Sequence, residues 1–255
     1  MYEKQAVCKD SLFLPKEELF LKLIKDIRLL ESNEPNEDGH GTPYDIGKIY
    51  GYNHLECMHI KERVVFYLRS LGEGFADFDH LFINFTPLIP HGEVRKNFRS
   101  NIREFSWFRY VDVGCDPILF NEWKMEEKTA FVLKTMRTSL ELMVEEGHRK
   151  MVTAAFDHAL EQGEKLELPY KHKENESYTM DIHIRITDDL DYIPVITVTG
   201  KNGTLILWQE LKAYARDALI CQFSAFSLGK RSCRVTPRKS YETTYYGLKP
   251  LKFTW

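Results

Sequence analysis

Hydrophobic residues recur at helical spacing in three segments of the chain. Over Lys16–Ser32, apolar side chains stand three and four positions apart among charged ones, which predicts an amphipathic helix. Met125–Glu145 has the same period, and we expect Gly147 to end that helix. A shorter helix is predicted over His148–Gln162, with Gly163 as its end signal.

A period of two, which is typical of strands, governs other segments. Leu81–Thr86 alternates until prolines interrupt it, and Phe105–Val113 is apolar on both faces, which suits a central strand. Ala218–Val235 alternates imperfectly and is expected to add further strand. Two hairpins are also predicted, the first joining Lys165–Lys173 to Tyr178–Thr187 and the second joining Val195–Thr199 to Thr204–Trp208.

One segment, Asn53–Leu71, suits two structures, because its short apolar run Val64–Leu68 fits a buried helix or a strand. We favour the strand. Helices and strands occur in blocks, which indicates an α+β fold with a mostly antiparallel, hairpin-rich C-terminal half packed against two or three amphipathic helices. We expect a single globular domain over residues 1–255, with a subdivision into 1–80 and 81–255 as the alternative.

Composition narrows the class of protein. A chain of 255 residues with 43% hydrophobic content can bury a substantial core, and its longest apolar runs are far shorter than a membrane span. Five cysteines without a repeating spacing argue against a disulfide framework and fit a reducing cytoplasm. The first residues, Met1–Gln5, are neither basic nor apolar, so we expect no secretory signal.

Charge is distributed unevenly along the chain. Gly229–Trp255 carries seven Lys or Arg against one Glu, about +6, whereas the whole chain is −3, so the first 228 residues are about −9. Glu31–Asp45 contains five acids, two prolines and two glycines with no Lys or Arg, which predicts an acidic surface loop. Such asymmetry steers binding partners and says little about fold.

Candidate metal ligands occur in His54-x2-Cys57-x-His59, with Glu62 close by. Imidazole and thiolate are the ligands that zinc prefers, but the spacing differs from common zinc modules and no second pair follows. We therefore favour structural or surface roles for these residues and expect no metal or other cofactor.

Other polar motifs are also interpreted as solvated turns. The chain has no Gly-x-Ser-x-Gly, no phosphate-binding glycine loop with its lysine and no complete calcium loop. The segments weighed and set aside are His91-Gly92-Glu93, Gly72-Glu73-Gly74 and Asp188-Asp189-x-Asp191.

Two stretches carry a family resemblance. Leu81–Leu88 followed by Trp107–Gly114, and the hairpin Leu168–Lys173 to Tyr178–His183, resemble bacterial immunity proteins of polymorphic-toxin systems. The resemblance covers about Leu81–Ile186, rests on strand residues and carries over no functional residue. It implies a cytoplasmic, non-catalytic protein that binds one cognate toxin, and a nuclease toxin with a basic channel would suit an acidic inhibitor.

That hypothesis predicts an acidic rim with aromatic anchors. The residues predicted to bind the partner are Glu34, Glu37, Asp38, Tyr44, Asp45, Tyr50 and Tyr52, although aromatic residues are more often part of a core. A competing interface is the polar face of the first hairpin, made of Lys171, Lys173, Asp181, His183 and Arg185.

Two other classes stay open. One is a hydrolase or transferase with a pocket built from His54, His59 and His91. The other is a nucleic-acid-binding module, in which the basic tail would hold phosphates and stack bases on its aromatic residues. That tail places Lys230, Arg231, Arg234, Arg238 and Lys239 near Tyr241, Tyr245, Tyr246, Phe253 and Trp255.

Overall fold

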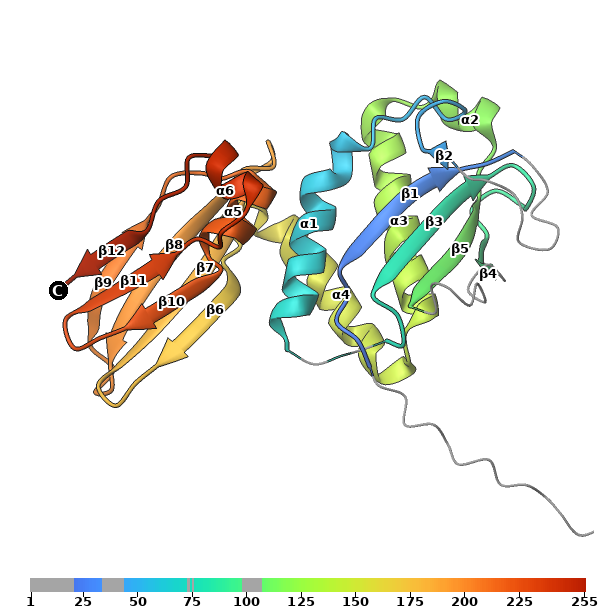
Figure 1. Cartoon of the computed structure of the whole chain (residues 1–255). Coiled ribbons are helices and arrows are strands. Elements are labelled where there is room, and N and C mark those ends of the chain that lie inside the picture. Colours follow the sequence, from blue (N-terminus) through green and yellow to red (C-terminus); the bar gives the residue numbers. More distant parts are fainter. Residues whose placement is uncertain (1–20, 34–43, 73, 75, 98–106) are drawn as a thin grey trace, which may run out of the picture.

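The computed structural model describes residues 21–33, 44–72, 74, 76–97 and 107–255 (Figure 1). The N-terminal half contains β1 (Asp26–Glu31), β2 (Tyr44–Asp45), α1 (Leu55–Ser70), β3 (His80–Thr86), β4 (Val94–Asn97), β5 (Phe108–Gly114), α2 (Pro117–Glu122), α3 (Met125–Met143) and α4 (Glu146–Glu161). The C-terminal half contains β6 (Leu168–Glu174), β7 (Tyr178–Ile186), β8 (Tyr192–Gly200), β9 (Leu205–Glu210), α5 (Arg216–Gln222), β10 (Ala225–Leu228), β11 (Ser232–Thr236), α6 (Tyr241–Tyr245) and β12 (Leu251–Thr254).

The N-terminal half is a mixed sheet in the order β2-β1-β3-β5-β4, covered on one face by helices (Figure 1). β1, β3 and β5 are parallel, and the short strands β2 and β4 are antiparallel at the two edges. Leu81, Ile83 and Phe85 are fully buried, as the alternation in β3 requires for a strand packed under helices. The fold is therefore α+β, with a parallel centre in its first sheet.

The C-terminal half is a sandwich of two antiparallel sheets, β6-β7-β8-β9 and β10-β11-β12. Met180, Ile182, Ile184 and Ile186 of β7 are fully buried and form the row that the predicted hairpin placed on one face. The second sheet packs against them with the buried side chains of Cys233, Val235 and Phe253. Residues 229–255, the basic tail, are thus part of the folded body.

Helix α1 lies between the two halves of the molecule (Figure 1). The Phe66 ring contacts the rings of Tyr170 and Tyr192 from the C-terminal half, while the helix also packs on β1 and α4. Because both sides are covered, Lys61, Glu62 and Arg63 are all buried, although a helix with one wet face would expose some of them.

Two predictions of secondary structure are wrong. Asp26–Glu31 is strand β1, not part of a helix, because it pairs in parallel with β3; residues 16–20 of that predicted helix lie outside the described residues. Residues 55–70 are helix, not strand: the apolar run Val64–Leu68 belongs to a helix buried on both sides. Length decides such cases, since a run of 16 residues exceeds an ordinary strand.

Other predictions are confirmed with shifted ends. The helix from Met125 ends at Met143, and Gly147 stands in the first turn of α4 and so does not end the preceding helix. Gly163 follows α4 with a φ of 53°, as expected of an end signal, and both hairpins form. The further strand predicted over Ala218–Val235 is confirmed only in β10 and β11, because residues 218–222 belong to helix α5.

Candidate functional site

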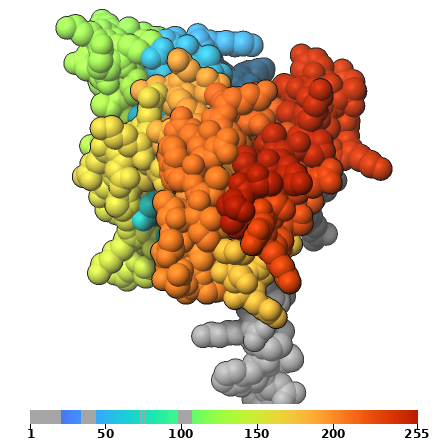
Figure 2. Space-filling view, turned by 90° about the vertical axis from the view of Figure 1, so that its left-hand side faces the viewer, coloured from blue at the N-terminus to red at the C-terminus, as the bar shows by residue number. Residues whose placement is uncertain are grey.

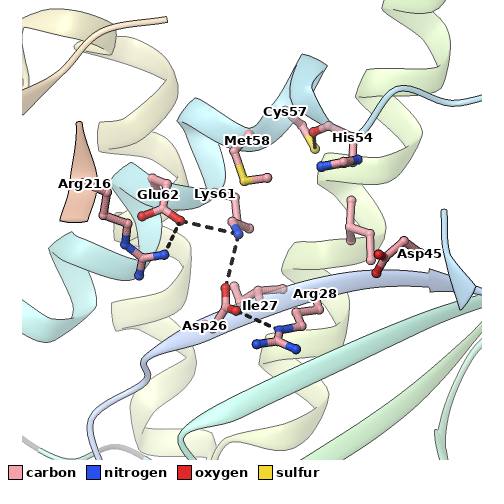
Figure 3. A pocket seen from close by; sticks show the side chains of 11 residues that line it. Asp26, Ile27, Arg28, Asp45, His54, Cys57, Met58, Lys61, Glu62 and Arg216 are labelled. Atoms are coloured by element: carbon pink, nitrogen blue, oxygen red, sulfur yellow. Dashed lines mark hydrogen bonds and ion pairs between the residues drawn. The ribbon is translucent and has the colours of Figure 1, made fainter. Parts of the chain in front are cut away.

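A cavity of about 300 Å³ lies between β1, the first half of α1 and the start of α5 (Figure 3). One wall is the strand segment Asp26–Leu29, and the opposite wall is a helical stripe of His54, Cys57, Met58 and Lys61. His54 is the N-cap of α1, and the three α1 residues lie on its side of the helix because they follow it by three, four and seven positions. Asp45, Glu62 and Arg216 complete the lining.

The strand wall of this cavity is an open sheet edge. β2 pairs only with Leu30 and Glu31, and the Ile46 N–H reaches one residue farther, to the Leu29 carbonyl at 3.2 Å. Even-numbered residues of β1 point their backbone groups at β3, as the bond from the Ser32 N–H to the Phe85 carbonyl shows. The N–H and C=O of Ile27 and the N–H of Leu29 therefore point to the open edge, where no described strand pairs with them.

Five charged side chains form a network at one end of the cavity (Figure 3). Lys61 Nζ lies 3.2 Å from Asp26 Oδ1 and 3.4 Å from Glu62 Oε1. Arg28 Nε donates to Asp26 Oδ2 at 3.0 Å, and Arg216 approaches Glu62 at 3.6 Å. A buried charge needs partners of this kind, since each is stripped of much of its water.

The ionisation of this network follows from its packing. Burial raises the pKa of Asp26, but the combined attraction and hydrogen bonds of Lys61 and Arg28 outweigh it, so the pKa lies below its usual value. The Tyr192 hydroxyl donates to Glu62 Oε2 at 2.9 Å, and burial followed by the Glu62 charge raises the pKa of that hydroxyl. Asp26 thus stays charged and Tyr192 stays neutral near pH 7.

The candidate metal ligands His54, Cys57 and His59 are dispersed over the N-cap and first turns of α1. Cys57 is buried, and burial raises the pKa of its thiol, which disfavours the thiolate that binds zinc. His59 lies across the helix, 3.6 Å from Asp188, and burial lowers its pKa against the opposing effect of Asp188. Within the described residues, no cluster of three or more His, Cys, Asp and Glu side chains is arranged for a metal.

The histidines of the proposed enzyme pocket do not converge. His54 lines the cavity, His59 pairs with Asp188, and the His91 ring stacks on Phe131 with centroids 5.1 Å apart. His91 Nδ1 accepts a hydrogen bond from the backbone N–H of Asp116 at 3.1 Å, so this ring nitrogen already has a partner within the fold. The three histidines therefore do not line a common pocket, contrary to the arrangement expected for a hydrolase or transferase.

The partner-binding residues predicted from the acidic segment lie in different environments. Glu34, Glu37 and Asp38 lie outside the described residues. Tyr44 and Asp45 are exposed on β2, whereas Tyr50 and Tyr52 are core residues with at most 1% exposure, which corrects their assignment as anchors. Tyr50 stacks edge-on against Phe85 and Phe120 and donates to the Cys115 carbonyl at 2.9 Å.

Glu31 also departs from the acidic-loop prediction, because it is fully buried. Its carboxylate accepts the backbone N–H groups of Gly47, Lys48, Ile49 and Tyr50 at 2.8 to 3.3 Å. Four consecutive N–H groups that converge on one anion form a backbone nest, and here the chain fills the nest with its own carboxylate.

The polar face predicted for the first hairpin is split. A bulge between Pro169 and Lys171 shifts the register of β6, so that Lys171 and Lys173 stand opposite Ile182 and Met180. The two lysines thus share the inner side, while Asp181, His183 and Arg185 keep the outer face. His172 joins the outer face instead and contacts Asp181 at 2.7 Å.

Strand β9 carries the exposed apolar side chains of the outer face. It is an edge of its sheet, and the exposed fractions are 57% for Leu205, 36% for Ile206 and 56% for Trp208. Figure 2 shows this side of the molecule, where the orange surface of the β8–β9 region borders the dark red C-terminal strand β12. The alternation of residues in β9 predicts a hairpin strand, but this pattern does not indicate that the strand lies at the edge of its sheet.

A second exposed group gathers aromatic residues on α6. Tyr241 and Tyr245 are 78% and 69% exposed, with stacked rings 6.1 Å apart. Arg238 beside them pairs with Glu242 at 3.8 Å, which offsets part of the basic charge predicted to attract nucleic acid.

No protein-family model, curated protein or solved structure matches this chain. None of the helices in the described ranges has the length and apolarity to cross a bilayer. Function is therefore inferred from the chain's own residues.

Proposed function

We propose that this chain is a non-catalytic, cytoplasmic binding protein that recognises another protein through the edge of β9. The observation that carries the proposal is an unpaired edge strand with exposed leucine, isoleucine and tryptophan side chains. Natural edge strands are usually protected by lysine, proline or a covering segment, because an open edge invites another strand to pair. An edge left apolar supports a role in binding.

The backbone of β9 is suited to receive a partner strand. Leu211 N–H donates to the Pro194 carbonyl, so Leu211, Gln209 and Leu207 direct their backbone groups at β8. Trp208 and Glu210 alternate with them and direct their N–H and C=O groups away from the sheet. A strand added there would gain main-chain hydrogen bonds and place a side chain against Trp208.

The partner that we propose is a cognate toxin, neutralised by tight binding. The support is the resemblance of Leu81–Ile186 to immunity proteins, together with a chain body of acidic balance that would be steered to a basic toxin surface. Tyr44 and Asp45, exposed on β2, and the acidic residues Glu34, Glu37 and Asp38 are kept as a rim that affects association rate.

The experiment compares capture of protein partners by the wild type, Trp208→Ala and Tyr241→Ala, each used as bait in lysate of the source cell. We expect a stoichiometric partner that Trp208→Ala binds at least about 30-fold more weakly, the loss typical of an interface tryptophan. Tyr241→Ala is the matched control, because it removes an even more exposed aromatic residue from another surface.

Three results would contradict the proposal. Equal capture by Trp208→Ala and the wild type would remove β9 from the interface. Loss in Tyr241→Ala alone would move the interface to α6, and recovery of nucleic acid in place of a protein would favour the basic tail.

Charge reversal at Glu34, Glu37 and Asp38 should slow association at low salt if these residues form the rim.

A further inference from the structure

The outer face of the second C-terminal sheet carries basic side chains among short ones. On β11 and β12, Cys233, Val235 and Phe253 are buried inside the sandwich, so the residues between them point outward. Arg234 and Lys252 stand directly opposite each other on this outer face, and both are exposed. The other side chains of the face are small, namely Ala225, Ser227, Ser232, Thr236 and Thr254. The face therefore leaves room for a ligand that lies flat across the strands.

The pair of Arg234 and Lys252 is unfavourable for the fold by itself. Two cations directly opposite each other on neighbouring strands repel, and in the described part of the chain neither side chain has an ion-pair partner. A lysine on the edge strand β12 is explained by protection of the edge. That explanation does not extend to Arg234, which lies on the central strand β11. The pair is suited to hold an anion, whose charge would offset the repulsion.

Positive charge continues beyond both ends of these strands. Four further cations are exposed in the turn between β10 and β11 and on either side of α6, namely Lys230, Arg231, Lys239 and Lys249. Residues 223–255 contain a single acid, Glu242, and it pairs with Arg238 at 3.8 Å. The remainder of the chain has an acidic balance, so its positive charge is concentrated on this surface. Charge complementarity therefore favours a ligand with several negative charges.

Helix α6 adds exposed aromatic rings at one end of the face. It joins the end of β11 to the start of β12, and it lies at that end of the sandwich (Figure 1). Tyr241 and Tyr245 are exposed and stacked, and the Tyr246 ring packs edge-on against Tyr245 with centroids 5.0 Å apart. Exposed rings beside cations are the two components with which proteins bind single-stranded nucleic acid, because rings stack on unpaired bases and cations contact phosphates.

We propose that the basic face, made of the outer side of β11 and β12 together with α6, binds single-stranded nucleic acid. Arg234 and Lys252 contact phosphate groups, and Tyr241 and Tyr245 stack on bases. A duplex hides the faces of its bases, so the tyrosines favour an unpaired strand. This activity goes beyond the protein binding proposed above, because β9 belongs to the other sheet of the sandwich.

The test is fluorescence anisotropy of a labelled oligothymidylate of about 12 nucleotides, titrated with the full chain. The double variant Arg234→Ala/Lys252→Ala should bind at least about tenfold more weakly than the wild type. Between about 50 and 200 mM salt, its plot of log affinity against log salt should be shallower by about 1.4, since each lost phosphate contact removes about 0.7. Lys134→Ala/Lys150→Ala is the charge-matched control, which removes two exposed lysines from α3 and α4 and should change neither quantity.

Two aromatic variants assign the stacking. Tyr241→Ala/Tyr245→Ala should weaken binding at least about tenfold with an unchanged salt slope, because stacking releases no counterions. Trp208→Ala should bind oligothymidylate as the wild type does, although we expect it to lose the protein partner, so the two proposals fail separately. Melting temperatures report the fold, and that of Arg234→Ala/Lys252→Ala should not fall, since the substitutions remove a repulsion.

Three results would overturn the proposal. One is the absence of oligothymidylate binding at about 100 µM protein in about 50 mM salt, conditions under which even a non-specific binder is detected. Another is equal binding by the wild type and Arg234→Ala/Lys252→Ala. The third is equal or tighter binding of a duplex of the same length, or of phosphatidylserine vesicles, which would assign the basic face to a different polyanion.

Discussion

At the scale of single residues, Glu31 holds a whole loop in place. Its carboxylate accepts four consecutive backbone N–H groups from residues 47–50 and has no exposed surface. Of the four donors, the Tyr50 N–H is buried and would otherwise lack a partner, which is costly for a backbone group. The same loop places Tyr50 and Tyr52 in the core.

Glu31→Ala is expected to lower the free energy of unfolding by about 2 to 4 kcal/mol, because four backbone donors lose the buried carboxylate that they share and the Tyr50 N–H is left buried without an acceptor. Urea denaturation measures the loss. Glu56→Ala, an exposed glutamate in the first turn of α1, serves as the control and should change stability by less than about 1 kcal/mol. Similar losses in both variants would contradict the role of Glu31.

Asp26 gives the fold a dependence on pH. Its pKa in the folded protein lies below the usual 3.8, so the unfolded chain binds its proton first as the pH falls. The stability from Asp26 is therefore fully present above about pH 5 and is lost as the pH falls through the lowered value.

Comparison of the wild type with Asp26→Asn by urea unfolding from about pH 6 to about pH 3 measures this effect. We expect the wild type to be the more stable at the upper end and the difference to shrink toward the lower end. A difference that stays constant over this range would mean that the ion pairs with Lys61 and Arg28 do not contribute.

Residue-level prediction from sequence succeeded least for charged and aromatic side chains. Glu31 was assigned to a wet loop, and Tyr50 and Tyr52 to an interface, because composition reports the average exposure of a segment. The convergence of four N–H groups on a carboxylate is a property of three-dimensional backbone geometry. The cavity residues Asp26, Arg28, Lys61 and Arg216 likewise come from segments far apart in the sequence, so no local sequence pattern predicts that they lie together.

At the scale of elements, α1 has a charged side that is buried as deeply as its apolar side. Arg63 is 2% exposed, and its guanidinium donates to the Ile186 carbonyl at 3.0 and 2.6 Å and to Asp188 Oδ1 at 2.7 Å. These bonds connect the helix to the end of β7, in the C-terminal half.

Arg63→Ala should therefore destabilise the protein by about 3 to 5 kcal/mol, since it leaves a buried carbonyl without its donor and removes a large side chain. Arg69→Ala, the same substitution near the end of the same helix, should cost less than about 1 kcal/mol because Arg69 is partly exposed. Chemical denaturation of both variants tests the contrast, and equal costs would refute it.

Sequence patterns predicted elements best where one face is wet. β7, the hairpin of β8 and β9, and helices α3 and α4 were found because their alternation or helical period separates two environments. α1 and β1 failed for one physical reason, which is that each has neighbours on more than one side. An element covered all round loses the period that identifies it.

At the scale of the whole molecule, α1 makes the two halves dependent on each other. It packs on β1 and α4 on one side and bonds to Ile186, Asp188 and Tyr192 on the other. Unfolding either half would leave Glu62 and Arg63 without their partners.

We therefore expect the central strands of both sheets, β3 and β7, to open together. Native-state hydrogen exchange should give their slowest amides the same free energy of opening, equal to that from denaturant unfolding. Opening of β7 at a clearly lower free energy than β3 would show that the halves unfold separately.

The Arg63 contacts also constrain how the chain can evolve. A change at position 63 alone leaves the Ile186 carbonyl without the guanidinium donor and removes that guanidinium from Asp188. A change at position 192 alone removes the hydroxyl that donates to Glu62. Substitutions at these contacts between α1 and the C-terminal half should consequently be tolerated in pairs. We expect natural variants of the chain to change residues 63 and 188 together, or residues 62 and 192 together. On the buried faces of the strands, apolar side chains of similar volume replace one another freely, so substitutions there should occur at single positions.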